Sequence, residues 1–396
     1  MTSEHLFNLT NVLAEPYFPE KQSPLQTMVN LGALRDNFLF LKKYLQPELM
    51  PVIKADAYGH GLVPCAQTLL AAGASRFAVG TVQEGAMLRE ASFTCPIVAL
   101  LGALSPAETQ LAAQQGITPL IASFEQLLAW QTAAGKNNLP FALKFDTGMG
   151  RLGFGFTQLS ELLNLLDQTP WLKPALLVSH LSVADEDNGV SFTEQQIKCF
   201  EEISAVLRKR FPDLKTSLFN SAGLLAHAGK IATDIGRPGI ALYGANPLQG
   251  TTLNKPAIDA ALKQAMQVRA PIVQVHALRQ GQSVSYGRTF VAPQDMRIAI
   301  VAAGYAEGYS RGLSNKGEMC LNGRRAPVLG RVCMQLTAID VSQVPDAKEG
   351  DFAFLLGGEG EAGISAAELA RLWGSITYEV FCLLGVINRR TYLFDI

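Results

Sequence analysis

Short apolar runs alternate with amphipathic stretches between about residues 30 and 245, and polar or glycine-rich turns separate them. The apolar runs are typical of buried strands, and the stretches at 62–73, 123–135 and 192–211 have helical spacing. Eight strands are predicted in this way, at 50–54, 76–81, 96–102, 118–123, 141–147, 175–182, 216–223 and 239–244. This alternation predicts an α/β fold with a parallel (β/α)8 TIM barrel. A doubly wound sheet is the alternative, because periodicity does not show closure.

The pattern changes after about residue 250, where short or alternating strands with glycine-rich turns replace the strand–helix alternation. One helix is predicted in this part, at 365–374. We therefore expect two domains. The first is a barrel over residues 1–250, to which a C-terminal segment could return, and the second is a mostly β domain over 251–396.

Composition narrows the class of protein. Of the 396 residues, 48% are hydrophobic and 17% are charged, which predicts a large buried core. The net charge of −1 argues against nucleic-acid or anionic-membrane partners, and no apolar window reaches the roughly 18 residues of a membrane span. The six cysteines are scattered without a C-x-x-C pair or a histidine cluster, so we expect reduced thiols, no metal site and a cytoplasmic location.

Reactive polar residues follow several of the predicted strands, where the chemistry of a (β/α)8 barrel takes place. The first strand ends at Lys54 in PVIKADAYGHG (51–61), although a buried ammonium group is poorly tolerated. The other residues of this kind are Tyr58, Lys144, Arg151, His180, Ser221 and Arg237. Each alone has an ordinary structural interpretation, but their position on one rim favours a catalytic site.

The loops around the seventh and eighth strands offer the hydroxyl of Ser221 and the backbone N–H groups of Gly239 and Ile240. Such barrels often bind a phosphate there. A phosphate site and a lysine at the end of a buried strand together predict pyridoxal phosphate, held by Lys54 as a Schiff base. Burial would lower the lysine pKa and give the neutral amine that this bond requires.

A dinucleotide-binding oxidoreductase is a rival hypothesis, because GMGRLG (148–153) matches G-x-G-x-x-G and follows a predicted strand. The acidic residue about 20 positions later should end the next strand in that motif. Here that residue is Asp167, which precedes the next strand. The sequence therefore disfavours this hypothesis.

Eight segments together resemble the alanine racemase family of fold-type III pyridoxal-phosphate enzymes, in the family's order and over about residues 28–395. They are VIKADAYGHG, KFDTGMGRLGFG, SHLSVADE, NSAG, IGRPGIALYG, SYGRTF, GYAEGYSRGL and GRVCMQLT. The resemblance implies interconversion of L- and D-alanine, a homodimer with active sites shared between subunits, and a supply of D-alanine for peptidoglycan.

The resemblance also implies roles for the site residues. Lys54 would serve as the base on one face of the substrate Cα, and Tyr286 of the other subunit would serve the opposite face. A chain of contacts from Tyr286 through His180 to Arg237 would support the tyrosine. Arg237 would face the pyridine nitrogen and, because a guanidinium keeps its proton, would leave that nitrogen unprotonated.

The remaining roles concern the phosphate and the substrate. Arg151 and the backbone N–H of the partner subunit's Met334 would bind the substrate carboxylate, and Lys144 matches a lysine that many members carry as a carbamate. Tyr305 and Tyr378 would narrow the entrance. The phosphate-contacting positions implied by the resemblance are Tyr58, Ser221, Gly239, Ile240 and Tyr378.

The chain departs from the family at Gln335, where an aspartate is usual, at Pro238, where a larger residue is common, and over about its first 25 residues. His60 is expected to be a loop residue without a role. A broader-specificity or serine racemase is the nearest alternative. A decarboxylase of the same fold type would carry a catalytic cysteine and a glutamate in place of Arg237, and a pyridoxal-phosphate carrier barrel would lack the domain that contains Tyr286.

Overall fold

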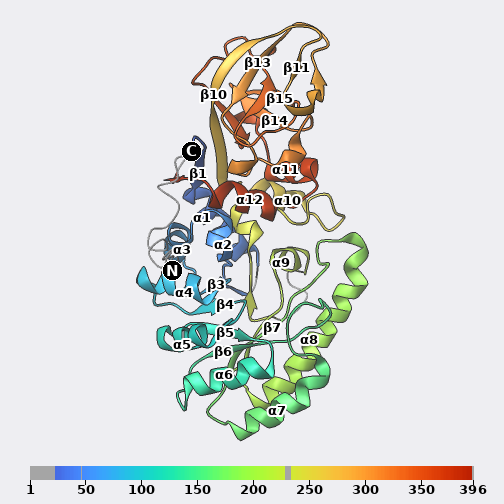
Figure 1. Ribbon diagram of the computed structural model, residues 1–396. Helices are drawn as coiled ribbons and strands as arrows, with labels where there is room; N and C mark the ends of the chain where they lie inside the picture. Colours follow the sequence, from blue (N-terminus) through green and yellow to red (C-terminus); the bar gives the residue numbers. More distant parts are fainter. Residues whose placement is uncertain (1–22, 46, 228–232, 395–396) are drawn as a thin grey trace, which may run out of the picture.

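The computed structural model describes residues 23–45, 47–227 and 233–394, which form a parallel α/β barrel and an antiparallel β domain (Figure 1). The predicted fold class is therefore confirmed. The barrel strands are short and almost wholly buried, and neighbours in the chain pair in parallel from β3 to β8. The barrel strands are β2 (Glu48–Leu49), β3 (Phe77–Val79), β4 (Ile97–Ala99), β5 (Thr118–Ile121), β6 (Phe141–Lys144), β7 (Pro174–Val178), β8 (Lys215–Ser217) and β9 (Ile235–Gly236).

Helices surround these strands, and capping residues in the sequence set several of their first turns. Thr81 and Glu84 form a reciprocal capping box on α4, and the Ser105 and Ser123 side chains cap α5 and α6. The helices of the barrel are α1 (Leu31–Tyr44), α2 (Lys54–Tyr58), α3 (Leu62–Ala71), α4 (Val82–Glu90), α5 (Pro106–Gln115), α6 (Phe124–Ala134), α7 (Leu159–Gln168), α8 (Val190–Arg210) and α9 (Ser221–His227).

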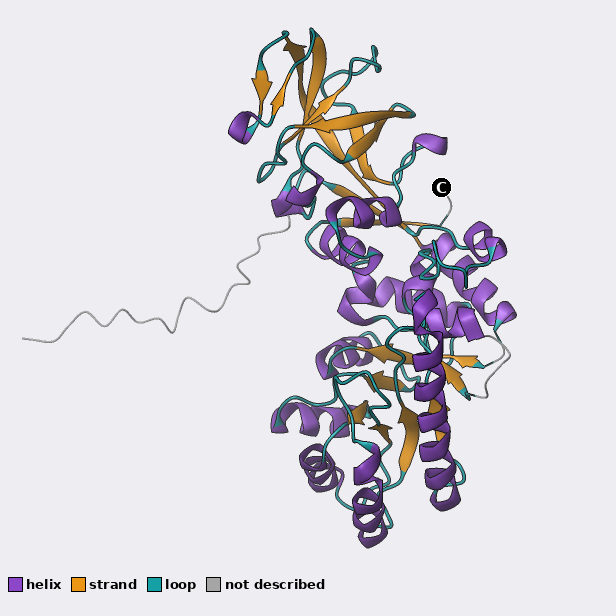
Figure 2. Ribbon diagram, turned by 90° about the vertical axis from the view of Figure 1, so that its right-hand side faces the viewer, coloured by secondary structure: helices purple, strands orange, loops and turns teal. Residues whose placement is uncertain are grey.

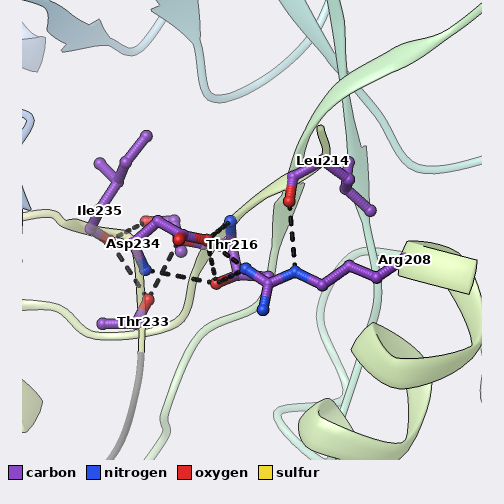
Figure 3. A network of polar contacts seen from close by, with 7 residues as sticks. Arg208, Leu214, Thr216, Thr233, Asp234 and Ile235 are labelled. Carbon is purple, nitrogen blue, oxygen red and sulfur yellow. Dashed lines mark hydrogen bonds and ion pairs between the residues drawn. The ribbon is translucent and has the colours of Figure 1, made fainter. Parts of the chain in front are cut away.

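The ring of strands closes through β2 and β9, which pair in parallel. On one side, a bridge between Val52 and Ala78 joins the β2 segment to β3. On the other side, Asp234 accepts hydrogen bonds from the backbone N–H of Thr216 (2.7 Å) and from its hydroxyl (2.8 Å), which holds β9 beside β8 (Figure 3). Arg208 of α8 forms an ion pair with the same carboxylate.

The eighth strand is not where the sequence predicts it. Residues 239–244 form a buried 3-10 turn, η4 (Ile240–Tyr243), and the strand is the two-residue segment β9 just before it. An apolar run that is bounded by glycines is equally compatible with a buried turn, and Gly244 ends this one with a φ of +88°. The prediction of a strand at 239–244 is therefore wrong, although the barrel still has eight strands.

The second domain is built on an eight-stranded sheet in the order β13-β16-β15-β14-β17-β10-β1-β18, and β10 also pairs with β13. One member, β1, comes from residues 26–30, which the sequence analysis assigned to the barrel; it pairs antiparallel with β10 and parallel with β18. The strands of this sheet are β1 (Gln26–Asn30), β10 (Met266–Leu278), β13 (Met296–Val301), β14 (Glu318–Leu321), β15 (Arg324–Leu329), β16 (Thr337–Asp340), β17 (Phe352–Leu356) and β18 (Arg390–Leu393). Two further strands, β11 (Ser283–Val284) and β12 (Phe290–Val291), form a separate antiparallel pair.

Three helices, α10 (Pro256–Ala261), α11 (Ala366–Trp373) and α12 (Thr377–Val386), lie between the sheet and the barrel (Figures 1 and 2). A continuous cluster of buried apolar side chains extends through both domains, from Leu25 to Leu384. Among the described residues no single helix is both long and apolar enough to cross a membrane; α11 and α12 reach that length only together, across a 104° bend.

Candidate active site

A cavity of about 570 Å³ opens at the C-terminal ends of the barrel strands, where α12 approaches the rim. It brings together ten of the residues predicted for the site: Lys54, Tyr58, Lys144, Arg151, His180, Ser221, Arg237, Gly239, Ile240 and Tyr378. Tyr286, Tyr305 and Met334 lie in the β domain and do not line this cavity. They are exposed on the chain by 71%, 44% and 57% respectively.

Lys54 begins a left-handed turn. The next four residues, 55 to 58, all have φ between 53° and 55°, although none is glycine. This conformation costs roughly 1–2 kcal/mol per residue for side chains other than glycine, so surrounding contacts must hold it. Burial lowers the pKa of the Lys54 amine, and the nearby Arg151 guanidinium lowers it further. The turn thus presents a partly desolvated amine to the cavity.

Two carboxylates tie this turn to its neighbours. Asp56 accepts a hydrogen bond from the N–H of Leu62 (2.7 Å) and forms an ion pair with Arg390 of β18. Glu84 accepts one from the N–H of Asp56 (3.1 Å) and one from the N–H of Gly80 (2.7 Å). The first residues of α3 and α4 therefore hold the backbone that carries Lys54.

His60 is a fully buried member of the same segment. Its Nδ1 lies 3.1 Å from the carbonyl oxygen of Ala57 and 3.0 Å from that of Tyr58. Burial lowers the pKa of His60 to about 3, so the ring is neutral and Nδ1 carries the donating hydrogen. The ring stacks on Tyr243, with centroids 4.4 Å apart, and meets the edge of Phe381. It is a loop residue, as predicted, but one that packs at the centre of the turn.

Arg237 is the buried cation of the site. Its guanidinium donates to the hydroxyl of Ser217 (2.6 Å) and to the carbonyl oxygens of Ser179 (2.5 Å) and Leu218 (3.1 Å), and it lies 3.2 Å from Nδ1 of His180. Burial lowers the pKa of Arg237 to about 10, which leaves it charged at neutral pH. Burial and this guanidinium hold the pKa of His180 well below its usual range, so its Nδ1 can accept the hydrogen bond.

Lys144 is buried at the end of β6, where its Nζ donates to the carbonyl oxygen of Phe145 (3.1 Å). Burial, together with the charge of Arg237, lowers the pKa of Lys144 to about 7. A large fraction of this amine is therefore neutral at physiological pH. The loop that follows carries Arg151 to the cavity.

The glycine-rich segment 148–153 does not open a helix, as a dinucleotide-binding motif would. It folds around the carboxylate of Asp146, which accepts hydrogen bonds from the N–H groups of Gly148 (2.8 Å) and Arg151 (3.0 Å). The next regular helix, α7, begins only at Leu159. The backbone donors of this loop are thus used within the protein.

The donors at the opposite end of the cavity suit a phosphate group. The hydroxyl oxygen of Ser221 accepts a hydrogen bond from the N–H of Gly239 (2.9 Å), which brings the two loops together. A Cβ on Gly239 would lie 2.5 Å from the hydroxyl oxygen of Tyr58, so only glycine leaves this space open. The Tyr58 and Tyr378 rings lie 5.8 Å apart at this end. Hydroxyl and backbone N–H groups here and an amine at Lys54 fit pyridoxal phosphate.

Sequence reasoning missed four polar residues that line the cavity, namely Thr81, Glu84, Ser179 and Asn220. The signal for Glu84 was present, because Thr81-x-x-Glu84 after a strand is a capping-box pattern. Asn220 accepts a hydrogen bond from the N–H of Gly223 (2.9 Å) and so begins α9. Within the described part of the chain, no group of three or more histidine, cysteine or acidic side chains is placed to hold a metal ion.

Comparisons with known proteins agree with this geometry. The family models for the alanine racemase N-terminal and C-terminal domains match residues 29–247 and 265–392. An alanine racemase of Nitratidesulfovibrio vulgaris (strain Miyazaki F) is 54% identical over 92% of this chain and 96% of its own length.

Solved structures are also similar. A biosynthetic alanine racemase from Pseudomonas aeruginosa has a TM-score of 0.82 at 34% identity, over 94% of this chain and 99% of its own. One from Bartonella henselae, described with covalently bound pyridoxal phosphate, has a TM-score of 0.82 at 28% identity, over 93% and 99% of the two chains. The chain therefore belongs to the alanine racemase family, whose members are pyridoxal-phosphate-dependent isomerases.

Proposed function

We propose that this protein interconverts L- and D-alanine by a two-base mechanism, with Lys54 on one face of the substrate and Tyr286 of a partner subunit on the other. The observation that carries the proposal is the cavity itself, which is lined by Lys54, by Arg151 and by the loops around β8 and β9. The 54% identity to a named alanine racemase supports alanine as the substrate.

The groups that line the cavity fit pyridoxal phosphate. When it is bound, this cofactor supplies an electron sink that makes the substrate Cα–H more acidic. Lys54 would hold the cofactor covalently. The groups proposed for its phosphate are the hydroxyls of Tyr58, Ser221 and Tyr378 and the backbone N–H groups of Gly239 and Ile240. Arg237, charged and buried, would face the ring nitrogen and leave it without a proton.

Lys54 suits the role of a base because burial and Arg151 lower its pKa. In its neutral form, the Nζ of Lys54 would take the Cα proton from one face of the substrate. A proton must then return to the opposite face, and in the reverse direction the two bases exchange roles. This requirement calls for a second base on the far side of the substrate.

Tyr286 is our candidate for that second base, and its exposure fits a role outside its own chain. In a homodimer with shared sites, Tyr286 of the partner subunit would reach the cavity and contact His180. The 3.2 Å contact between His180 and Arg237 would continue the chain of contacts that supports the tyrosine. Met334 of the partner subunit would offer its backbone N–H to the substrate carboxylate.

The other substrate contacts follow from the cavity rim. Arg151 would bind the carboxylate, and Tyr305 and Tyr378 would narrow the entrance in favour of a small side chain. The neutral fraction of the Lys144 amine can react with CO₂ to give a carbamate and a proton, and the resulting negative charge would orient Arg151. Isotopically labelled CO₂ would give a carbamate signal in the wild-type protein that Lys144→Met lacks, and equal spectra would contradict this modification.

The proposal is tested by colour and by conversion of L-alanine. The purified protein should be yellow with bound cofactor and should form D-alanine. The Lys54→Ala variant should be colourless, and its kcat should fall by at least about a thousandfold, because the substitution removes both the attachment point of the cofactor and a base. Lys198→Ala, at an exposed position on α8, is the matched control and should keep both. Full racemase activity in Lys54→Ala would disprove the mechanism.

Two finer parts of the proposal have their own tests. Assays with L-serine beside L-alanine separate an alanine racemase from an enzyme of broader specificity, which would turn over both equally well. A role in peptidoglycan synthesis makes a prediction for cells that lack both this gene and every other source of D-alanine. Such cells should grow only when D-alanine is added. The cytoplasmic location stays a prediction.

A further inference from the structure

Glu307 is a buried carboxylate in the β domain to which the proposed chemistry gives no role. It is 4% exposed, and none of the ion pairs formed by the described residues includes it. Two neutral donors hold it instead: the N–H of Gly304 on Oε2 (2.9 Å) and the side-chain amide of Gln335 on Oε1 (3.1 Å). A buried carboxylate depends on such donors, so these bonds fix where Glu307 lies.

The two partners of Glu307 belong to two segments that also bind each other through the backbone. The N–H of Tyr305 donates to the carbonyl oxygen of Cys333 (3.1 Å), and the N–H of Ala306 donates to that of Met334 (2.9 Å). The segments are so close that a Cβ on Gly304 would lie 2.2 Å from the carbonyl oxygen of Cys333. The bond between Glu307 and Gln335 is the side-chain part of this contact.

A third element joins the same cluster. The Asn388 side chain donates to the backbone oxygen of Glu307 (3.0 Å) and to that of Leu384 (2.9 Å), near the end of α12. At the start of the same helix, Tyr378 lines the cavity. Glu307 therefore lies where the segments that carry Tyr305, Met334 and Tyr378 are held together.

We propose that Glu307 and Gln335 form a positioning pair that sets the substrate-carboxylate end of the active site and its entrance. The inference rests on the proposed function, in which the Met334 N–H binds the substrate carboxylate in the site of the other subunit and Tyr305 narrows the entrance. Neither side chain of the pair touches the substrate; they act by fixing residues 304–307 against residues 333–335. The carboxylate only accepts hydrogen bonds, so its partner has to be a donor such as the amide of Gln335.

An exchange of the two side chains tests the pair. Gln335→Glu brings two carboxylates together and should raise the KM for L-alanine about tenfold, while kcat stays within about threefold. In the double variant Glu307→Gln/Gln335→Glu, the amide oxygen at 307 can accept from Gly304 and its nitrogen can donate to the new carboxylate. The double variant should therefore return the KM to within about threefold of the wild-type value.

Gln343→Glu, at an exposed position of the same domain, adds the same charge and should leave the KM unchanged. The inference is overturned if Gln335→Glu keeps the wild-type KM, if the double variant is no better than Gln335→Glu, or if kcat falls as far as the KM rises. Thermal unfolding of the wild type, both single variants and the double variant separates this inference from the proposed function. If the wild type proves not to racemise alanine, non-additive melting temperatures would still support the pair, and additive ones would reject it.

Discussion

Burial determines the protonation of the residues that meet in the cavity. The same low-dielectric environment lowers the pKa of Lys54, brings that of Lys144 to about 7 and keeps His180 neutral. Arg237 stays charged because even a pKa of about 10 lies above neutral pH. The site thus combines a buried permanent cation with amines that can lose their protons, which the proposed base catalysis and carbamate formation both need.

Lys144 should make the stability of the protein depend on pH in a defined direction. Its pKa is about 7 in the folded state against 10.5 for an ordinary lysine. Between these values the unfolded chain binds one more proton, so the free energy of unfolding rises with pH by up to about 1.4 kcal/mol per unit. This contribution is lost as the pH falls towards 7.

The check is denaturant unfolding of wild type and Lys144→Met in CO₂-free buffers between pH 7 and pH 10. The wild type should gain stability relative to the variant as the pH rises, while Lys198→Met should follow the wild type. Parallel curves for wild type and Lys144→Met would show that Lys144 has no depressed pKa.

Much of the site was predictable at the level of residues, because a barrel brings strand ends together whatever their order in the chain. Lys54, Lys144, His180 and Arg237 were found for this reason, and they line one cavity. The buried position of His60 was not predictable, since a histidine between two glycines resembles an exposed turn. The hydrogen bond between Gln335 and Glu307 joins two segments about 30 residues apart in the chain, so no local sequence pattern predicts it.

The left-handed turn after Lys54 is the element that the sequence gives least reason to expect. Alanine at 55 and 57 has no preference for positive φ, so the conformation is imposed by Asp56, Glu84 and His60. By contrast, strands β3 to β8 follow from their apolar runs, whereas the first strand was predicted at 50–54 and lies at Glu48–Leu49. The eighth was misplaced because a strand of two residues leaves no periodic pattern.

His60→Phe tests what holds this turn. The substitution keeps an aromatic ring against Tyr243 and Phe381 but removes the donor to the carbonyl oxygens of Ala57 and Tyr58. We expect the free energy of unfolding to fall by about 1 to 3 kcal/mol, because both carbonyl oxygens lose the imidazole donor and that of Ala57 keeps only backbone donors such as the His60 N–H (3.0 Å). Urea denaturation measures this loss, and His227→Phe is the comparison variant. A His60→Phe protein as stable as the wild type would mean that packing alone holds the turn.

On the scale of the whole molecule, the proposed sharing of active sites between two subunits makes a quantitative prediction about mixed dimers. Lys54→Ala and Tyr286→Phe should each be inactive alone, because every site in either homodimer lacks one base. A mixed dimer regains one intact site, with Lys54 from one subunit and Tyr286 from the other. Random mixing in equal amounts should therefore restore about one quarter of the wild-type activity.

The experiment requires co-refolding or co-expression of the two variants, with each variant treated alone as the control. Mixtures that stay inactive while forming dimers would show that both bases come from one chain.

The place of β1 between β10 and β18 has a consequence for the order in which the chain folds during synthesis. The barrel strands leave the ribosome in the order in which they pair, so most of that domain can assemble as it appears. β1 precedes them all, yet both of its partners are made later, and β18 is the last of the described strands. One edge of β1 is therefore open to pairing with other chains until β10 is made, and the other edge until β18 is made, a hazard that the nascent polypeptide must survive.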